Sequence, residues 1–240
     1  MKLLWLLLLL PLLSSAQTEV RDSVTYLTFK VNHPQNISEK DFDEVDFSKE
    51  QPESEFILHG DIPLTYRFKL QNDTIAILYK IVDHKSVHTE AMGYQSYFLY
   101  RDDDGYLHSN FKITDFDKDG DEDLLCWIYS NMNGNVWTII WLNDQKTQKL
   151  VKLYNTADDT EIWDRPEYDP AKQIINTTLD AGVYGISNEA TYKLEGLTAI
   201  PLRKYEENRS QVIHIIQNEY VGKRGKWKLR KSQKIIYDEN

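Results

Sequence analysis

The densest group of residues that could carry chemistry is an acidic loop at residues 115–123, which reads DFDKDGDED. Carboxylates alternate along this loop, and Gly120 stands between the third and fourth of them. In calcium loops of this spacing, alternate side chains turn toward one hard cation, and the glycine permits the sharp turn. The spacing predicts a Ca²⁺ site, with Asp121 offering its backbone carbonyl, built from Asp115, Asp117, Asp119, Asp121 and Asp123.

The charge of this loop favours the same prediction. Six acids and one lysine fall within nine residues, and such a group repels itself strongly unless a cation neutralises it. A solvated acidic turn remains the alternative. The loop is not part of a helix-loop-helix hand, because Cys126 stands where that motif needs a bidentate glutamate, and an apolar run follows at 124–129. The loop is therefore predicted to join two strands, with the ion in a structural rather than a catalytic role.

Other chemistries find less support, so no catalytic residue is assigned and a non-enzymatic protein is predicted. His84 and His88 are four residues apart, but the sequence lacks the H-E-x-x-H pattern of zinc proteases. Cys126 lies in an apolar strand pattern, where a buried, unreactive thiol is expected. No G-x-S-x-G motif occurs. A pair of carboxylates for glycoside hydrolysis stays open, because the sequence does not give their separation.

The elements that must position the loop are predicted to be strands. The chain has 15 Tyr, 8 Phe and 6 Trp, residues that suit pleated, half-buried surfaces. Only residues 83–92 have a pattern that allows a helix. Short alternating runs separated by turn signals predict an all-β antiparallel meander, either propeller-like or a barrel or sandwich. The predicted strands include 64–70, 74–82, 96–101, 124–129, 136–142, 148–154, 173–178, 190–194, 211–220 and 226–231.

The first sixteen residues have the layout of a secretory signal peptide. Lys2 precedes an apolar run at residues 3–13, and small residues follow at 14–16. Cleavage is expected between Ala16 and Gln17. A membrane anchor is the alternative, but the apolar run is about half of the roughly 20 residues that span a bilayer. We therefore expect a secreted or periplasmic protein with no membrane span after cleavage.

The rest of the chain divides by charge. Residues 17–55 hold a predicted strand at 24–31 and an acidic arm at 38–55, and residues 56–240 form one predicted β domain. The chain has 28 basic and 38 acidic residues, which makes nucleic acid an unsuitable main partner. Ten of the cations fall at 203–234 beside three acids. These cations either face water or pair with the acidic body, or they form a basic face for an acidic partner.

The loop and its surroundings resemble known proteins. FKITDFDKDGDEDLLCWIY resembles the FG-GAP type of calcium repeat found in integrin-like and bacterial secreted propellers. Over residues 95–200, the loop is followed by WTIIWLND, EYDPAKQIINT and ATYKLEGL. This order resembles a family of bacterial periplasmic proteins with a propeller-like β fold, some of which inhibit lysozyme-like cell-wall hydrolases or act as immunity proteins against them.

The resemblance implies a calcium-stabilised, non-enzymatic protein that acts by protein contact. Such inhibitors insert an exposed loop into the hydrolase cleft, and residues 181–187 are a candidate, with Gly182, Val183 and Tyr184 as partner-binding residues. This loop departs from the Ser-Gly-containing loop expected of the family, and an ordinary connection between strands is the alternative reading. A glycan-binding or glycan-cleaving envelope protein that uses Trp and Tyr as sugar platforms also remains open, as does a purely structural one.

Overall fold

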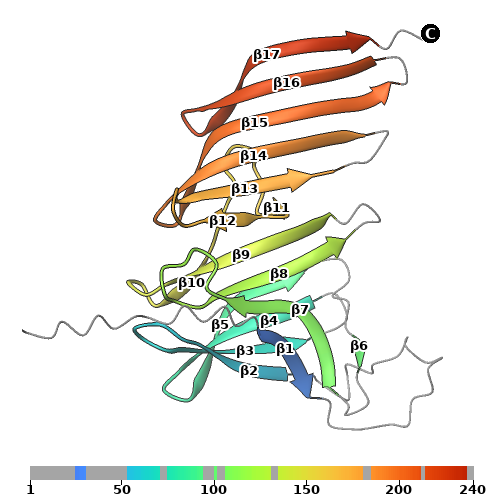
Figure 1. Cartoon of the computed structure of the whole chain (residues 1–240). Helices are drawn as coiled ribbons and strands as arrows, with labels where there is room; N and C mark the ends of the chain where they lie inside the picture. The colour runs from blue at the N-terminus through green and yellow to red at the C-terminus, as the bar shows by residue number, and fades with distance from the viewer. Residues whose placement is uncertain are drawn as a thin grey trace, which may run out of the picture.

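The structure is a computed structural model, and every element in the part of the chain that it describes is a β-strand (Figure 1). It describes residues 25–30, 53–70, 75–93, 100–101, 106–130, 135–180, 185–211 and 214–236. The strands form two antiparallel sheets and one isolated bridge. The predicted all-β antiparallel fold is confirmed. Within these ranges neither sheet closes on itself, so a closed barrel is not what they form.

The larger sheet contains eleven strands and holds the acidic loop. Its main path runs β10-β9-β8-β7-β1-β2-β3-β4-β5, while β11 pairs with β9 and β6 pairs with β7. The strands are β1 (Thr25–Lys30), β2 (Glu53–Leu58), β3 (Leu64–Leu70), β4 (Ile75–Val82), β5 (Lys85–Gly93), β6 (Tyr100–Arg101), β7 (Tyr106–Thr114), β8 (Asp123–Ser130), β9 (Val136–Asp144), β10 (Lys149–Lys152) and β11 (Trp163–Asp164).

The N-terminal strand is inserted between two meanders. β1 pairs with β7 on one side and meets β2 on the other, so it joins β2–β5 to β7–β10. β2 begins at Glu53, inside the segment predicted as an acidic arm. The first strand thus belongs to the same sheet as the residues after 56. The predicted signal peptide at 1–16 and the arm through residue 52 lie outside the described residues.

The prediction that residues 83–92 could form a helix is wrong, because they form a turn followed by β5, which pairs with β4 along its length. The turn between the two strands is Asp83-His84, and both residues have positive φ, 50° and 61°. Two consecutive positive φ values are the hairpin turn that follows the right-handed twist of strands. The sequence signal was missed because neither residue is the glycine that usually marks this turn.

The smaller sheet contains six strands in chain order, β12 to β17. In Figure 1 it extends away from the larger sheet and ends at β17. The predicted turn near 222–225 is present as Arg224-Gly225, where both residues again have positive φ. The strands are β12 (Glu167–Asp169), β13 (Ile174–Leu179), β14 (Ile186–Glu195), β15 (Thr198–Gln211), β16 (His214–Lys223) and β17 (Lys226–Ile236).

The β8–β9 hairpin is buried on both faces. Successive side chains of a strand point to opposite faces, so a strand covered on both sides reads as a continuous apolar run. Ile139 and Trp141 of β9 pack in the core of the larger sheet, with Phe68 and Phe111. Ile140 and Leu142 belong to a second core, shared with β13 and β14 of the smaller sheet. This hairpin therefore joins the two sheets.

Gly222 is required by a close approach of β16 to β15. A Cβ atom at this position would lie 1.7 Å from the carbonyl oxygen of Pro201. The obstacle is backbone, which cannot turn aside as a flexible side chain can. The backbone conformation of this glycine is not the constraint, because its φ angle lies outside the positive range that other residues rarely adopt.

We expect Gly222→Ala to lower the free energy of unfolding by about 1–3 kcal/mol, the usual cost of forcing a methyl group into filled space. Urea unfolding of the variant and the wild type measures the difference. Ser232→Ala, on exposed β17, is the control and should change stability by less than about 0.5 kcal/mol. Equal stability of Gly222→Ala and wild type would contradict the close approach.

Candidate metal centre

The acidic loop connects β7 to β8 and is closed at its base by strand pairing. Thr114, the last residue of β7, pairs with Asp123, the first residue of β8. This pairing brings the two ends of the loop together. One carboxylate oxygen from each of Asp115, Asp117 and Asp123 lies within 4.8 Å of the others. Three of the five predicted ligands are therefore gathered at one point.

Asp123 is the buried member of the group, with 1% of its surface exposed. Its two carboxylate oxygens accept hydrogen bonds from the backbone N–H groups of Phe116 and Asn143, each at 2.8 Å. Burial raises its pKa well above the ordinary value, and the charge of Asp117 adds to that rise. The two hydrogen bonds oppose the rise but do not cancel it.

Asp115 and Asp117 each have a buried carboxylate oxygen, Oδ1, that has no hydrogen-bond partner. Burial raises the pKa of Asp117 to about 7, with further contributions from the charges of Asp119 and Asp115. The pKa of Asp115 is also raised, first by burial. Buried acceptors without a donor are unfavourable, and a bound cation is a common way to satisfy them.

Asp119 and Asp121 take different positions from the other three. Neither belongs to the group that converges within 4.8 Å. Asp119 is exposed, and its Oδ1 accepts a hydrogen bond of 2.9 Å from the backbone N–H of Asp121. The Oδ1 of Asp121 accepts a hydrogen bond of 3.3 Å from the backbone N–H of Asp61. The side chain of Asp121 is thus bonded to the β2–β3 turn, and the prediction for this residue concerned its carbonyl oxygen only.

The backbone of the loop follows the predicted turn. Gly120 has a φ of 101°, and its N–H donates to Oδ2 of Asp115 at 3.2 Å. No atom lies within 4 Å of the position that a Cβ would take, so the glycine is needed for its φ rather than for space. Lys118 also has a positive φ, 60°. These two residues allow the chain to curl around the carboxylates.

The β2–β3 turn holds the loop from outside and is itself bonded to a third turn. The backbone groups of His59 and Glu122 are joined by a hydrogen bond of 2.7 Å, and His59 also donates its N–H to the Glu122 carboxylate at 2.9 Å. Gln145, in the turn after β9, accepts a hydrogen bond of 2.7 Å from the N–H of Ile62. The β2–β3 turn is therefore joined to both the acidic loop and the β9–β10 turn.

Asn143 was not predicted from the sequence, yet it lies beside the cluster. It is 4% exposed, and neither polar atom of its side chain has a hydrogen-bond partner. Its side chain lines a hollow of about 520 Å³ together with Asp117, Asp119 and Asp121. Asn143 is twenty residues from Asp123, and only the β8–β9 pairing brings them together. No local pattern in the sequence could have found this residue.

This donor set fits a hard cation. The converging atoms are carboxylate oxygens, and Asn143 adds an unpartnered amide oxygen nearby. Ca²⁺ takes six to eight oxygen ligands from carboxylates, carbonyls, amides and water. The group of three contains no histidine or cysteine nitrogen or sulfur, the ligands that softer metals prefer.

The predicted partner-binding residues Gly182, Val183 and Tyr184 lie outside the described residues, but both ends of their loop are described. At one end, the side chain of buried Asn135 bonds the backbone of Asp180 through both its oxygen and its nitrogen. At the other end, the carbonyl of Gly185 accepts a hydrogen bond of 2.8 Å from the N–H of Arg209. The base of the loop is thus fixed to neighbouring strands.

Outside the acidic loop, the carboxylate of Asp158 anchors the smaller sheet. Its carboxylate accepts hydrogen bonds from Tyr192 at 2.7 Å, from Asn155 at 3.0 Å and from the indole N–H of Trp227 at 3.0 Å. Burial alone would raise the pKa of Asp158, but these bonds and the charge of Lys204 lower it. Because its donors satisfy it, this carboxylate is a structural anchor.

Cys126 is fully buried, and burial raises the pKa of its thiol far above the ordinary range, as expected for an unreactive core residue. His84 is exposed in the β4–β5 turn.

The described residues include no helix that is long and apolar enough to cross a membrane.

Comparisons with known proteins identify no family for this chain. No protein-family model matches the chain, and no curated protein matches it. One solved structure, described as a Xanthomonas type IV secretion system related protein, is similar with 16% identity and a TM-score of 0.46. The match covers 85% of this chain and 99% of that one. A likeness of this size carries no inference about function.

In EDTA, we expect the protein to lose stability as the pH rises from about 5.5 to 7.5. The folded-state pKa values of Asp117 and Asp123 are raised, whereas unfolded aspartates titrate near 4. Between these values the folded state binds more protons than the unfolded state, so raising the pH favours unfolding. Urea unfolding at both pH values measures the change.

Asp117→Asn is the control for this prediction, because its amide cannot ionise. It should show a smaller loss of stability over the same pH range. A wild-type protein that becomes more stable with rising pH in EDTA would contradict the assignment of raised pKa values to the loop.

Proposed function

We propose that this chain is a secreted or periplasmic calcium-binding β protein that acts through contact with a protein partner and not by catalysis. The observation that carries the calcium assignment is the pair of buried, unpartnered oxygens on Asp115 and Asp117 beside buried Asp123. Secretion is supported by the signal-peptide pattern of residues 1–16.

The proposed ion has carboxylate ligands from Asp115, Asp117 and Asp123. The carbonyl of Asp121 follows from the loop spacing, and Asp119 lies close enough for its charge to raise the pKa of Asp117. The amide oxygen of Asn143 is an additional candidate, since it lacks a hydrogen-bond partner and lines the same hollow. In this arrangement the ion neutralises charges that otherwise repel each other in a partly dry site.

The role of the ion is to stabilise a connection. The loop joins β7 to β8, and it is bonded to the β2–β3 turn through His59 and Asp61. Asn143 adds the end of β9. An ion held at this point fixes three connections of the larger sheet at once. The proposed role of the ion is accordingly structural.

The proposed partner is a lysozyme-like cell-wall hydrolase. The protein would act on it either as an inhibitor or as an immunity protein that protects the cell from it. The support is the resemblance to periplasmic inhibitors and the loop 181–184, whose two ends are held by Asn135 and Arg209. A loop with a fixed base is suited to insertion, because less conformational freedom is lost on binding.

We expect Ca²⁺ at about 100 times its Kd to raise the Tm relative to EDTA by roughly 5–10 °C. Binding at that ratio contributes about 2.7 kcal/mol, and each kcal/mol corresponds to about 2–4 °C in a chain of this size. Differential scanning calorimetry measures the shift. Asp117→Ala should abolish it, because this substitution removes a central ligand.

Asp83→Asn is the matched control, since it removes one carboxylate from the exposed β4–β5 turn, outside the acidic loop. This variant should keep the full response to Ca²⁺. If metal-free and calcium-loaded wild-type protein melt at the same temperature, the metal assignment is wrong.

We also expect the protein to slow the release of dye from labelled peptidoglycan by lysozyme-type hydrolases. Tyr184→Ala should weaken inhibition at least tenfold if loop 181–184 enters the cleft, in line with the cost of removing a central aromatic anchor. Tyr154→Ala, at a tyrosine that is 42% exposed on another loop, is the control and should inhibit like the wild type.

Retention of the protein on insoluble peptidoglycan, without inhibition of any hydrolase in the panel, would instead favour the glycan-binding alternative. That outcome would remove the inhibitor proposal and would leave the calcium assignment untouched, because the two rest on different residues.

A further inference from the structure

β17 forms an open edge of the smaller sheet. It pairs with β16 along its length, from Lys226↔Lys223 to Ile236↔His214, and it is the last strand in the sheet order. None of the other described strands pairs with its outer side. Every second N–H and C=O group of an edge strand points outward, so such an edge is a template for another strand.

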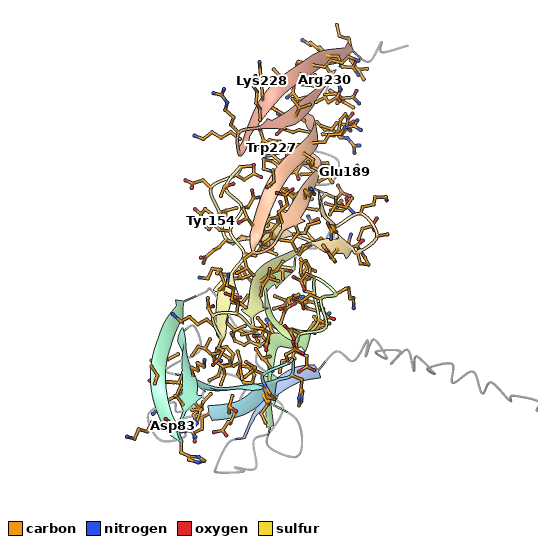
Figure 2. All side chains as sticks on the ribbon, turned by 90° about the vertical axis from the view of Figure 1, so that its left-hand side faces the viewer. Asp83, Tyr154, Glu189, Trp227, Lys228 and Arg230 are labelled. Atoms are coloured by element: carbon orange, nitrogen blue, oxygen red, sulfur yellow. The ribbon has the colours of Figure 1, made fainter. Side chains whose placement is uncertain are left out.

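Only one end of β17 is held by the body of the protein. Trp227 donates its indole N–H to Asp158 and packs against the ring of Tyr192, with 5.4 Å between ring centroids. From Lys228 to Ile236, every side chain is exposed. Figure 2 shows side chains projecting from both faces of this part of the ribbon, where Lys228 and Arg230 are labelled. This part of the sheet is a single layer.

The exposed edge is strongly basic. β17 contains five cations and no acid, namely Lys226, Lys228, Arg230, Lys231 and Lys234. Among the described residues, Arg230 is the member of this set with an ion pair, at 3.2 Å from Glu219 of the neighbouring strand. The four lysines of β17 are exposed and are not in ion pairs among the described residues, whereas Lys204 of β15 pairs with Asp158 of the acidic body at 3.4 Å.

Residues 231–236 form the regular part of the edge. The pairing with β16 shifts by one residue at Arg230, and from Lys231 to Ile236 it continues without interruption. At about 3.3 Å per residue, this stretch is roughly 20 Å long, a usual length for a strand pairing. Each face of the stretch carries a lysine followed by an isoleucine toward the C-terminus, Lys231 with Ile235 and Lys234 with Ile236.

The basic residues decide which strand can pair here. Lysines on an edge commonly prevent pairing between copies of one protein, because like charges on adjacent strands repel each other. A second β17 would bring five more cations to this edge. The same lysines attract a strand that carries acids, so the edge excludes self-pairing and selects for a partner of opposite charge.

We infer that β17 accepts an acidic β-strand of a partner protein, which adds to the smaller sheet along residues 231–236. The acids of that strand face Lys231 and Lys234, and apolar side chains cover Ile235 and Ile236, which are 38% and 67% exposed. This inference deepens the proposed action through protein contact and does not depend on calcium.

The test uses a fluorescent nine-residue peptide that contains two adjacent valines followed by four adjacent glutamates, added to the full-length protein. Because consecutive side chains point to opposite faces, each face of this strand carries glutamate opposite a lysine and valine opposite an isoleucine when it pairs antiparallel to β17. Anisotropy should rise at low salt and fall as salt is added, because the contacts are ionic. Amide hydrogen exchange of residues 231–236 should slow when the peptide binds, since strand addition protects outward N–H groups. A peptide with lysine in place of glutamate, and one with a central proline, should not bind.

Variants of the protein locate the contact. Lys231→Gln with Lys234→Gln should weaken peptide binding several-fold, while Lys85→Gln with Lys146→Gln, at exposed lysines elsewhere, should not. Ser232→Pro and Gln233→Pro are made as a pair, because alternate N–H groups face β16 and solvent. The one that keeps the wild-type Tm has lost an outward N–H and should lose the peptide.

The inference is overturned if the glutamate peptide does not bind, if the lysine peptide binds equally well, or if binding leaves the exchange of residues 231–236 unchanged. A dimer in light scattering that disappears in the proline variants would identify a second copy as the occupant and would also overturn it. Measurement in both Ca²⁺ and EDTA, beside the hydrolase assay, separates failure of this inference from failure of the proposed function.

Discussion

The burial of the Asp123 carboxylate at the start of β8 is the constraint on which the site depends. A carboxylate with 1% exposure requires donors, and the structure supplies two backbone N–H groups. One comes from Phe116 in the loop, which must therefore curl back over β8. The other comes from Asn143, which fixes the end of β9 beside the loop. These two bonds bring Asp115 and Asp117 to the same point, where their negative charges repel each other.

The position of this carboxylate also connects the site to the rest of the fold. Asp123 begins the hairpin whose two faces lie in different cores, one for each sheet. Within the loop, Phe116 is 8% exposed and packs in the second core, whereas the residues on either side, Asp115 and Asp117, turn toward the cluster. The alternation that presents the carboxylates thus also anchors the loop in apolar packing. An ion at this point would stabilise more than its own loop.

The spacing of the aspartates predicted that Asp115, Asp117 and Asp123 converge, because the geometry of such a loop is local. It also predicted Asp119 as a ligand, and that carboxylate lies outside the group of three. The features that the sequence could not predict depend on pairing between strands that are distant in the chain. Asn143 joins the cluster only because β8 pairs with β9, and β1 enters the sheet beside β7, which is far from it in sequence. The Asp83-His84 turn was missed for a local reason, since two non-glycine residues adopt positive φ there.

The acidic loop and the basic edge strand carry charges of opposite sign, and the loop's charges are partly buried whereas those of the edge are exposed. In the loop, burial weakens screening by water, so a small number of carboxylates creates a strong demand for a counter-ion within a few ångströms. On β17 the four lysines are exposed, and water and salt screen their charges without an ion pair. Their effect appears only when a strand approaches and water leaves the contact. Charge at the buried site therefore makes the stability of the fold depend on neutralisation, whereas charge at the edge determines which strands can pair with it.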